Sequence, residues 1–288
     1  MLVQPNTKNQ NLPKPFLKWA GGKSKLLEQY KYYLPKNFKS YYEPFLGGGA
    51  VFFYVNQNLH KKAVLTDINN NLIETYLCVR DNVEHLIELL SEHQKKHNKA
   101  YYYEMRSLSY NTDLERAARL IYLNKTCFNG LYRENSKGKF NVPIGRYVNP
   151  PICQPDLLRS VSIALQSAVI DVRPFEDILK YANSDDFVYF DPPYHPLSDT
   201  SYFTAYSRYS FNEDNQIKLR NIFAELAAQG VKVMLSNSDC TFIRELYSDD
   251  KIFQANNLPT IHTISASRAI NSNPKKRGKI SEILVTSY

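Results

Sequence analysis

The segment FVYFDPPY, residues 187–194, places chemically active groups directly after an apolar run. Its first four residues are apolar or aromatic and predict a buried strand. Asp191 then supplies a hydrogen-bond acceptor, and Pro192 and Pro193 fix a carbonyl beside it with no neighbouring N–H to satisfy. Two converging acceptors suit an exocyclic amino group, which carries two hydrogens, and Tyr194 offers a face for stacking. The tetrapeptide therefore predicts a clamp for an amino-bearing ring. Its alternative, a stiff strand-to-helix turn, leaves the acid and the ring without a role.

A glycine loop, EPFLGGGAVFF, follows an earlier apolar run and opens an expected helix. Glycines at such a turn let the backbone approach a ligand closely, although a plain turn is the alternative for the glycines alone. The dinucleotide fingerprint is absent. Asp67 stands twenty residues after Gly47, at the end of the next expected strand, where a carboxylate can accept both hydroxyls of a ribose. Together they predict a site for a nucleoside without a pyrophosphate.

These groups must be positioned by alternating strands and helices. Strands are expected at 41–44, 61–67, 167–172, 187–190, 231–237 and 280–288. A helical stripe of Leu219, Ile222, Phe223 and Leu226 ends before Gly230. Such alternation predicts an α/β fold with a mainly parallel sheet covered on both faces, completed by the last strand. Ligands bind beyond the carboxyl ends of these strands, so the residues expected along one edge are Gly47, Asp67, Asp191 and Asn237.

The region 77–164 interrupts this alternation. Helical faces are expected around residues 83–90 and 114–121, the second opened by a capping box of Thr112 and Glu115. From there to residue 165 the sequence is polar, basic and rich in turn residues. Its apolar residues show no clear helical or strand spacing. We therefore expect one domain made of residues 1–76 and 165–288, with an insertion at 77–164 that has a separate task.

Charge and composition narrow the function. The 288 residues carry a formal charge of +8. Basic residues cluster at 14–39 and 116–146, each with a single acid and with interleaved aromatics, as nucleic-acid surfaces often have. A solvated charged face is the alternative for either cluster alone. The four cysteines lack metal-ligand spacing, and no apolar run is long enough for a signal or a membrane span. We expect a soluble cytoplasmic protein without metal or membrane.

Six motifs carry a resemblance to a known family. They are FLKWAGGKSKL, YYEPFLGGGAVFF, LTDIN, FNGLYREN, GKFNVPIGRY and YFDPPYHPLS. Together, and in this order over nearly the whole chain, they resemble the Dam-type, D12-class, site-specific DNA adenine-N6 methyltransferases. The resemblance implies a Rossmann-like methyltransferase sheet with an inserted, mainly helical target-recognition domain at 77–164.

The resemblance also implies a cofactor, a substrate and site residues. S-adenosylmethionine would donate a methyl group to N6 of an adenine turned out of double-stranded DNA. Lys23 would reach the methionine carboxylate, and Trp19 would pack near the sulfonium. The implied cofactor-binding residues are Trp19, Lys23, Phe45, Gly47, Gly49, Asp67 and Asp191. The implied catalytic residues are Asp191, Pro192, Pro193 and Tyr194. The implied DNA-binding residues are Phe128, where the family often has tyrosine, Asn129, Leu131 and Arg133, with Arg133 as the reader of a guanine.

The target is expected by resemblance alone to be GATC, with the protein acting as a monomer that is associated with the nucleoid through DNA. Three alternatives remain open. The first is a nucleotide-binding oxidoreductase, but the dinucleotide-binding fingerprint of such enzymes is absent from this sequence. The second is a non-catalytic nucleic-acid-binding module, but in such a module the clamp or the cofactor loop would be interrupted, and both are intact here. Transfer to cytosine N4 is chemically similar, because that amino group also has two hydrogens. Whether a restriction enzyme accompanies the protein is not determined by the sequence.

Overall fold

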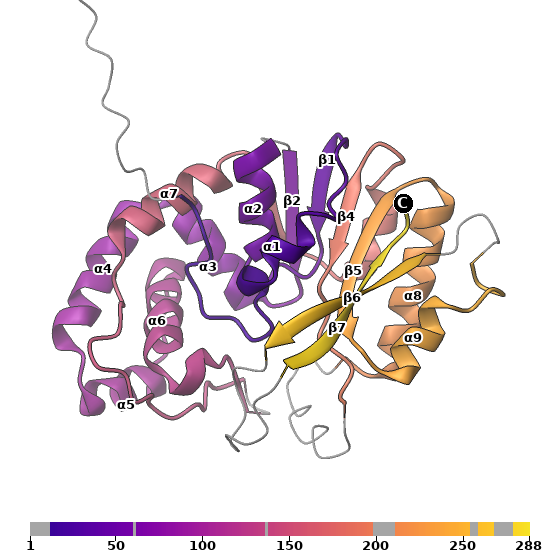
Figure 1. Cartoon of the computed structure of the whole chain (residues 1–288). Coiled ribbons are helices and arrows are strands. Elements are labelled where there is room, and N and C mark those ends of the chain that lie inside the picture. The colour runs from indigo at the N-terminus through magenta and orange to yellow at the C-terminus, as the bar shows by residue number, and fades with distance from the viewer. Residues whose placement is uncertain (1–11, 60–61, 136–137, 198–210, 254–258, 268–278) are drawn as a thin grey trace, which may run out of the picture.

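A seven-stranded sheet organises the molecule (Figure 1). The computed structural model describes residues 12–59, 62–135, 138–197, 211–253, 259–267 and 279–288. The strand order is β3-β2-β1-β4-β5-β7-β6, in which β1 to β5 pair in parallel and β7 is antiparallel to both neighbours. The chain leaves the central β1 first toward β2 and β3, then returns to β4 on its other side. This change of direction creates a topological switch point between β1 and β4, where such sheets bind ligands.

The strands are β1 (Ser40–Glu43), β2 (Lys62–Asp67), β3 (Ala168–Val172), β4 (Phe187–Phe190), β5 (Lys232–Ser238), β6 (Thr260–Ser267) and β7 (Lys279–Thr286). The first helices are η1 (Lys23–Lys25), α1 (Leu27–Tyr30), α2 (Ala50–Leu59), α3 (Asn70–Asp81), α4 (Val83–Lys96) and α5 (Lys99–Ser107). The later ones are α6 (Asp113–Thr126), η2 (Phe128–Gly130), α7 (Pro155–Leu165), η3 (Phe175–Lys180), α8 (Glu213–Ala228) and α9 (Thr241–Tyr247).

Both faces of the sheet are covered, as expected for a mainly parallel sheet. Successive residues of a strand point to opposite faces, so Tyr41 packs into a core shared with α2, α3 and α6, while Tyr42 packs into a second core with η3, α8 and α9. Figure 1 shows α8 and α9 on one side of the sheet and the helices α3 to α7 on the other. The predicted α/β fold class with a mainly parallel sheet is confirmed.

Most predicted elements are confirmed, with two corrections. The helical stripes correspond to α4, α6 and α8, and the Thr112 side chain caps α6 by accepting from the Glu115 backbone N–H at 3.3 Å. The last strand does not end the sheet, because β7 lies between β5 and β6. The prediction of a loop up to residue 164 is wrong for its last part, because residues from Pro155 onward form α7. Pro155 stands in the first turn of this helix, where proline is tolerated.

The insertion shares its core with the sheet domain. Buried side chains of α4, α6 and α7 belong to the same hydrophobic cluster as those of α2 and the sheet, without a break between them. The predicted boundary at residue 76 falls within α3, whose first half follows β2 and whose second half leads into the insertion. Because they share this core, the insertion packs tightly against the sheet.

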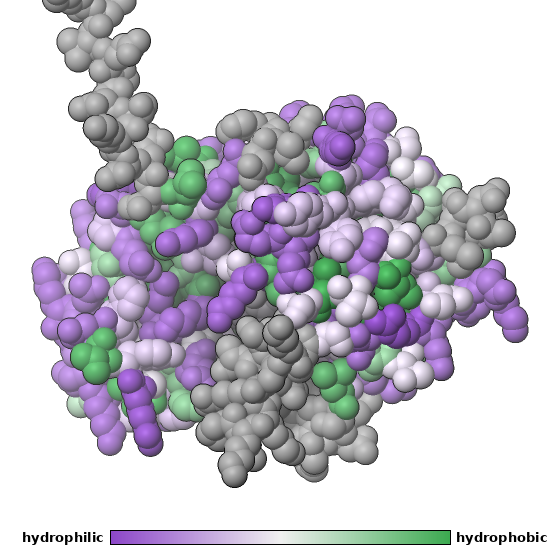
Figure 2. Space-filling model, in the orientation of Figure 1, coloured by the Kyte–Doolittle hydropathy of each residue, from purple (hydrophilic) through white to green (hydrophobic). Residues whose placement is uncertain are grey.

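The surface in Figure 2 is largely hydrophilic, and its hydrophobic residues form small separate groups. All four cysteines are free thiols. Within the described ranges no cluster of three or more histidine, cysteine, aspartate or glutamate side chains could hold a metal ion. A search of the same residues finds no helix of the length and apolar character that a bilayer crossing requires.

Candidate active site

Two loops flank the switch point of the sheet. The glycine loop leaves the carboxyl end of β1, and Asp191 to Tyr194 leave the carboxyl end of β4, which pairs with β1. Asp67 ends the neighbouring β2, and Asn237 lies near the end of β5. The structure therefore brings the predicted edge residues to neighbouring strand ends.

The glycine loop is fixed by hydrogen bonds to β2. The Gly47 N–H donates to Asp67 Oδ2 at 3.1 Å, and the Asn69 N–H donates to Asp67 Oδ1 at 3.0 Å. Burial raises the pKa of the Asp67 carboxyl, while these backbone N–H groups act to lower it. Gly47 has φ +48°, and a Cβ there would lie 2.9 Å from Trp19 Cδ1. A side chain at this position would therefore be strained and would collide with the indole.

Lys23 and Asp191 form a largely buried ion pair at the centre of the site. The Lys23 Nζ lies 2.7 Å from Asp191 Oδ1 and also donates to the Gly21 carbonyl. Ser236 Oγ donates to the same Asp191 oxygen at 2.8 Å. Among the described residues no donor reaches Asp191 Oδ2 or the Pro192 carbonyl. These two acceptors, on adjacent residues, therefore have no hydrogen-bond donor in the part of the chain that the structure describes.

A chain of amides holds the backbone after Asp191. Gln216 Nε2 on α8 donates to the Pro193 carbonyl at 2.9 Å, and Asn237 Nδ2 donates to Gln216 Oε1 at 2.9 Å. Asn237 Oδ1 in turn accepts from the His195 N–H at 3.2 Å. Gln216 and Asn237 are both buried, so this chain fixes the tetrapeptide firmly against β5.

Tyr194 is held at both its ring and its hydroxyl. The Lys23 ammonium lies 4.6 Å from the centroid of its ring, and the Tyr194 hydroxyl donates to Glu282 Oε2 on β7 at 2.8 Å. Burial, more than the nearby anions, raises the pKa of Tyr194 well above its ordinary value. Tyr194 therefore stays a neutral ring with a fixed plane.

A second carboxyl group lies under the glycine loop. Glu43, at the end of β1, is 2% exposed and accepts from the Tyr41 hydroxyl at 2.6 Å. Burial raises the pKa of Glu43 to about 8, with nearby Asp191 raising it further and Lys23 lowering it. Glu43 is therefore mostly protonated at neutral pH, so it adds little negative charge beside Asp191.

Two predicted cofactor residues pack against other aromatic rings. Trp19 stacks on Tyr132 of the insertion, with ring centroids 5.3 Å apart and an angle of 26°. Phe45 stacks on Phe175, with ring centroids 5.3 Å apart and an angle of 27°. Gly49 belongs to the turn that begins α2. Of these rings, the Trp19 indole lies directly against the Gly47 turn.

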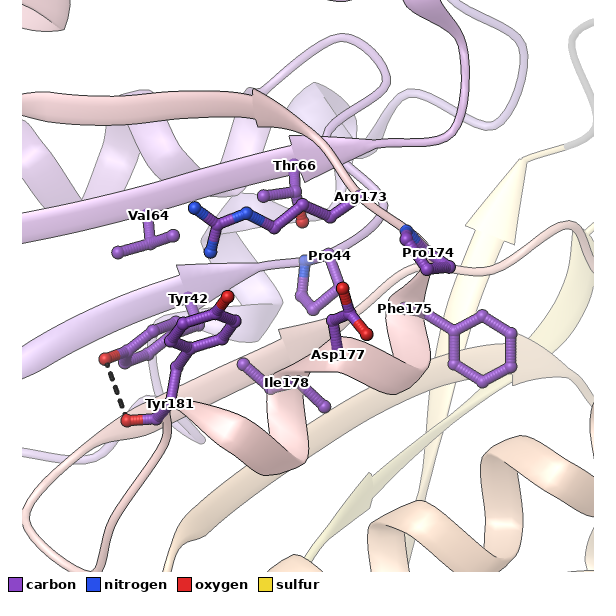
Figure 3. A pocket seen from close by; sticks show the side chains of 10 residues that line it. All are labelled: Tyr42, Pro44, Val64, Thr66, Arg173, Pro174, Phe175, Asp177, Ile178 and Tyr181. Carbon is purple, nitrogen blue, oxygen red and sulfur yellow. Dashed lines mark hydrogen bonds between the residues drawn. The ribbon is translucent and has the colours of Figure 1, made fainter.

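Phe175 also lines a shallow cleft between the sheet and η3 (Figure 3). Its other walls include Tyr42, Thr66 and Arg173, whose guanidinium extends across the strand side chains. Arg173 Nε donates to Asp171 Oδ2 at 2.8 Å, and the guanidinium lies 4.5 Å from the Tyr181 ring centroid. Asp177, the other charged residue of the cleft, is paired with Lys180 at 2.6 Å, so both charged groups of this cleft already have partners.

The predicted DNA-contacting residues lie on an exposed loop of the insertion. Lys23 and Asp191, in contrast, belong to the sheet domain. Phe128 is 47% exposed, and Asn129 is exposed with a left-handed φ of 56°. Leu131 is half-buried, and the exposed Arg133 donates from Nε to Asn141 Oδ1 at 2.7 Å. The loop therefore presents an aromatic ring, an amide and a guanidinium to solvent.

Sequence reasoning missed the residues that support this site. They are Glu43, Tyr132, Gln216, Ser236 and Glu282. Ser236 and Glu282 could be found only through the pairing of β5 with β4 and β7, because nothing in their local sequence sets them apart. Asn237 was expected at the edge, but its link to the clamp through α8 depends on the packing of that helix.

This chain is similar in sequence to several known proteins. Residues 19–264 match the family of D12 class N6 adenine-specific DNA methyltransferases. The type II methyltransferase M1.LlaDCHI of Lactococcus lactis subsp. cremoris is 44% identical over 289 residues, covering 98% of each protein. The type II methyltransferase M.MjaIII of Methanocaldococcus jannaschii is 42% identical over 296 residues, covering 96% of this chain and 99% of that protein. The DNA adenine methylase of Escherichia coli K12 is 35% identical over 273 residues, 93% of each.

The matched range runs from Trp19 to β6 and so contains the glycine loop, the insertion and the clamp. This family match excludes the oxidoreductase alternative. It also excludes transfer to cytosine N4, because the class is specific for adenine N6. The strand order and the antiparallel β7 agree with the predicted Rossmann-like methyltransferase sheet. This chain belongs to the D12 class of N6 adenine-specific DNA methyltransferases, enzymes that methylate the exocyclic amino group of adenine in DNA.

Proposed function

We propose that this enzyme transfers a methyl group from S-adenosylmethionine to the adenine of GATC in double-stranded DNA, with the base flipped into a pocket formed by residues 191–194. The observation that carries the proposal is the pair of available acceptors, Asp191 Oδ2 and the Pro192 carbonyl, beside the fixed ring of Tyr194. An adenine amino group has two hydrogens for these acceptors, and a flipped base can stack on the tyrosine. The GATC target follows from the Dam-type resemblance.

The residues around Gly47 fit the proposed cofactor. Asp67 is a carboxylate at the end of β2, suited to ribose hydroxyls, and the neighbouring Ile68 leaves 47% of its side chain exposed as apolar surface for an adenine ring. The left-handed turn at Gly47 has no room for a side chain. Lys23 offers a cation for the methionine carboxylate, and Trp19 a π-face near a sulfonium. The bound cofactor would supply a methyl group activated by a positively charged sulfur. Phe45 and Gly49 complete the proposed cofactor-binding set.

Asp191 acts in this mechanism as an acceptor that orients the nucleophile. The lone pair of adenine N6 is delocalised into the ring, so the amino group is a poor nucleophile. Hydrogen bonds from its two N–H groups to Asp191 and Pro192 favour a more tetrahedral nitrogen, whose lone pair can point at the methyl group. Once methylated, the nitrogen is acidic enough to lose its proton without a strong base. Pro193, held by Gln216, keeps the acceptors in place, and Tyr194 stacks on the ring.

The insertion at 77–164 is the proposed target-recognition domain. Phe128 and Asn129 are assigned to the gap that the flipped base leaves, and Leu131 to a base edge. Arg133 is assigned to guanine O6 and N7, the commonest specific pairing in the major groove. The exposure of Phe128, Asn129 and Arg133 on one loop of a basic segment supports these assignments. A monomer suffices, because the transfer addresses one base at a time.

The target can be tested on plasmid DNA modified exhaustively by the enzyme. The DNA should resist an endonuclease that is blocked by adenine methylation at GATC, and sequencing should place the methyl group on that adenine. An endonuclease that cuts the same site regardless of methylation serves as the control. Complete cleavage by the sensitive endonuclease, or methyl groups on other adenines, would refute the GATC assignment while leaving the adenine chemistry intact.

A further inference from the structure

Tyr132 connects the proposed recognition loop to the proposed cofactor pocket. It stands in the chain between Leu131 and Arg133, yet its ring stacks on Trp19 with centroids 5.3 Å apart. Trp19 also lies against the glycine loop, since a Cβ on Gly47 would be 2.9 Å from the indole. Tyr132, Trp19 and Gly47 therefore form one continuous contact from the recognition loop to the turn beside Asp67.

The hydroxyl of Tyr132 is fixed as firmly as its ring. It donates to the Glu134 carboxylate, and Asn71 Nδ2 donates to both the Tyr132 hydroxyl and Glu134 Oε1, each at 3.2 Å. Asn71 lies in the first turn of α3, which begins three residues after Asp67. Phe140 packs edge-on against the ring at 6.0 Å. The side chain therefore has one defined orientation, set by both parts of the molecule.

A second contact ties the same two segments together. Asn124 Nδ2 donates to the carbonyls of Lys18 and Gly130, at 2.7 and 3.1 Å. Gly130 has φ +63°, and a Cβ there would collide with the Lys18 side chain. The backbones on either side of the stack thus lie against each other, and neither Trp19 nor Tyr132 can shift alone without breaking packed contacts.

We propose that Tyr132 is a positioning residue that energetically couples the cofactor pocket to the target-recognition loop. Because neither ring can shift alone, a ligand that displaces Trp19 also displaces Tyr132, and with it the adjacent Arg133. DNA bound at Arg133 displaces Trp19 in the same way. Such coupling is reciprocal, so each ligand must strengthen the other by the same factor. The inference rests on the proposed cofactor and DNA sites.

The coupling factor is measured by calorimetric titration of S-adenosylhomocysteine into the free enzyme and into its complex with a cognate GATC duplex. For the wild-type protein we expect about a 5- to 150-fold tighter binding in the complex, the usual range for coupled sites. Tyr132→Ala should reduce this factor to about 1 while each ligand still binds alone. Tyr132→Phe should retain most of it, because the stack survives. The matched control is Tyr103→Ala on α5, whose ring packs on Tyr102.

Each outcome decides the matter. An unchanged factor in Tyr132→Ala, even with both affinities weakened, would assign the residue a structural role only and overturn the coupling, as would a wild-type factor of 1. Should Tyr132→Ala fail to fold, Tyr132→Leu keeps an apolar contact with Phe140 without a planar stack and should give the same loss. A wild-type protein that binds no S-adenosylhomocysteine would instead overturn the proposed cofactor site, together with this inference.

Discussion

At the scale of single residues, the two oxygens of Asp191 have different surroundings. Oδ1 is engaged by Lys23 and Ser236, and no described donor reaches Oδ2. Lys23 is 3% exposed, so its charge is balanced locally by this carboxylate. The ion pair keeps Asp191 in one orientation, in which Oδ2 is the oxygen that we propose as the acceptor for the adenine amino group.

Asp191→Ala should lower the rate of methyl transfer by about a hundred- to thousandfold, the typical effect of removing one preorganised transition-state contact. Ser236→Ala should lower it less, by about tenfold, because a hydrogen bond to a charged carboxylate contributes about 1.5 kcal/mol and Lys23 still holds the same oxygen. Single-turnover assays with labelled cofactor measure both, and a DNA-binding assay should show little change. Because Asp191→Ala leaves Lys23 without its counter-ion, thermal unfolding must accompany the assay. A folded Asp191→Ala protein with wild-type turnover would exclude the assigned role.

At the scale of elements, the described segment before η1 has little secondary structure of its own and is fixed by other elements. Asn124, in the last turn of α6 and 1% exposed, accepts from the Lys18 N–H at 2.7 Å and donates to the Lys18 and Gly130 carbonyls. One amide thereby satisfies three backbone groups from two segments. The position of the proposed cofactor motif thus depends on a helix of the insertion.

Asn124→Ala should lower the free energy of unfolding by about 2 to 4 kcal/mol, because three hydrogen bonds of about 1 kcal/mol each are lost and their backbone partners stay buried. Urea unfolding of the two proteins provides the measurement. Asn111→Ala, at an exposed asparagine just before α6, is the control and should change stability by less than about 0.5 kcal/mol. Equal small losses in both variants would contradict the role given to Asn124.

At the scale of the whole molecule, the shared core makes the stability of the sheet depend on that of the insertion. His93 of α4 is 8% exposed, stacks on Tyr122 at 5.0 Å and bonds through Nδ1 to the Tyr101 hydroxyl at 2.8 Å. Burial, with a smaller contribution from Lys96, lowers the pKa of His93 to about 4. Because its ordinary value is 6.5, the unfolded chain binds this proton at a higher pH than the folded one.

Stability should therefore fall as the pH is lowered from about 6.5 to about 4, by up to about 3 kcal/mol from His93 alone. His93→Gln removes the titration and should flatten this part of the curve. Urea unfolding at several pH values between 7.5 and 4.5 measures the difference. His85→Gln, an exposed histidine on the same helix, should keep the wild-type slope. If the two variants have the same slope, His93 is not the titrating group.

The sequence alone determined those features that depend on the order of neighbouring residues along the chain. An apolar run followed at once by Asp191, Pro192 and Pro193 can end a strand in only a few ways, because proline restricts the backbone on either side. The alternation of strands with helices likewise predicted a mainly parallel sheet, and parallel strands bring their carboxyl ends to one edge. The edge location of Gly47, Asp67 and Asp191 therefore follows from the order of residues along the chain.

Only the tertiary structure decided which distant groups support these residues. Ser236 meets Asp191 because β5 pairs with β4, and Glu282 meets Tyr194 because β7 is inserted beside β5 instead of at the edge. The stack of Tyr132 on Trp19 joins residues more than a hundred positions apart. Helix α7 was missed although Leu158, Val161 and Leu165 recur at helical spacing, because the prolines before it were interpreted only as turn signals. Contacts between such distant groups depend on strand order and helix packing, which local sequence patterns do not specify.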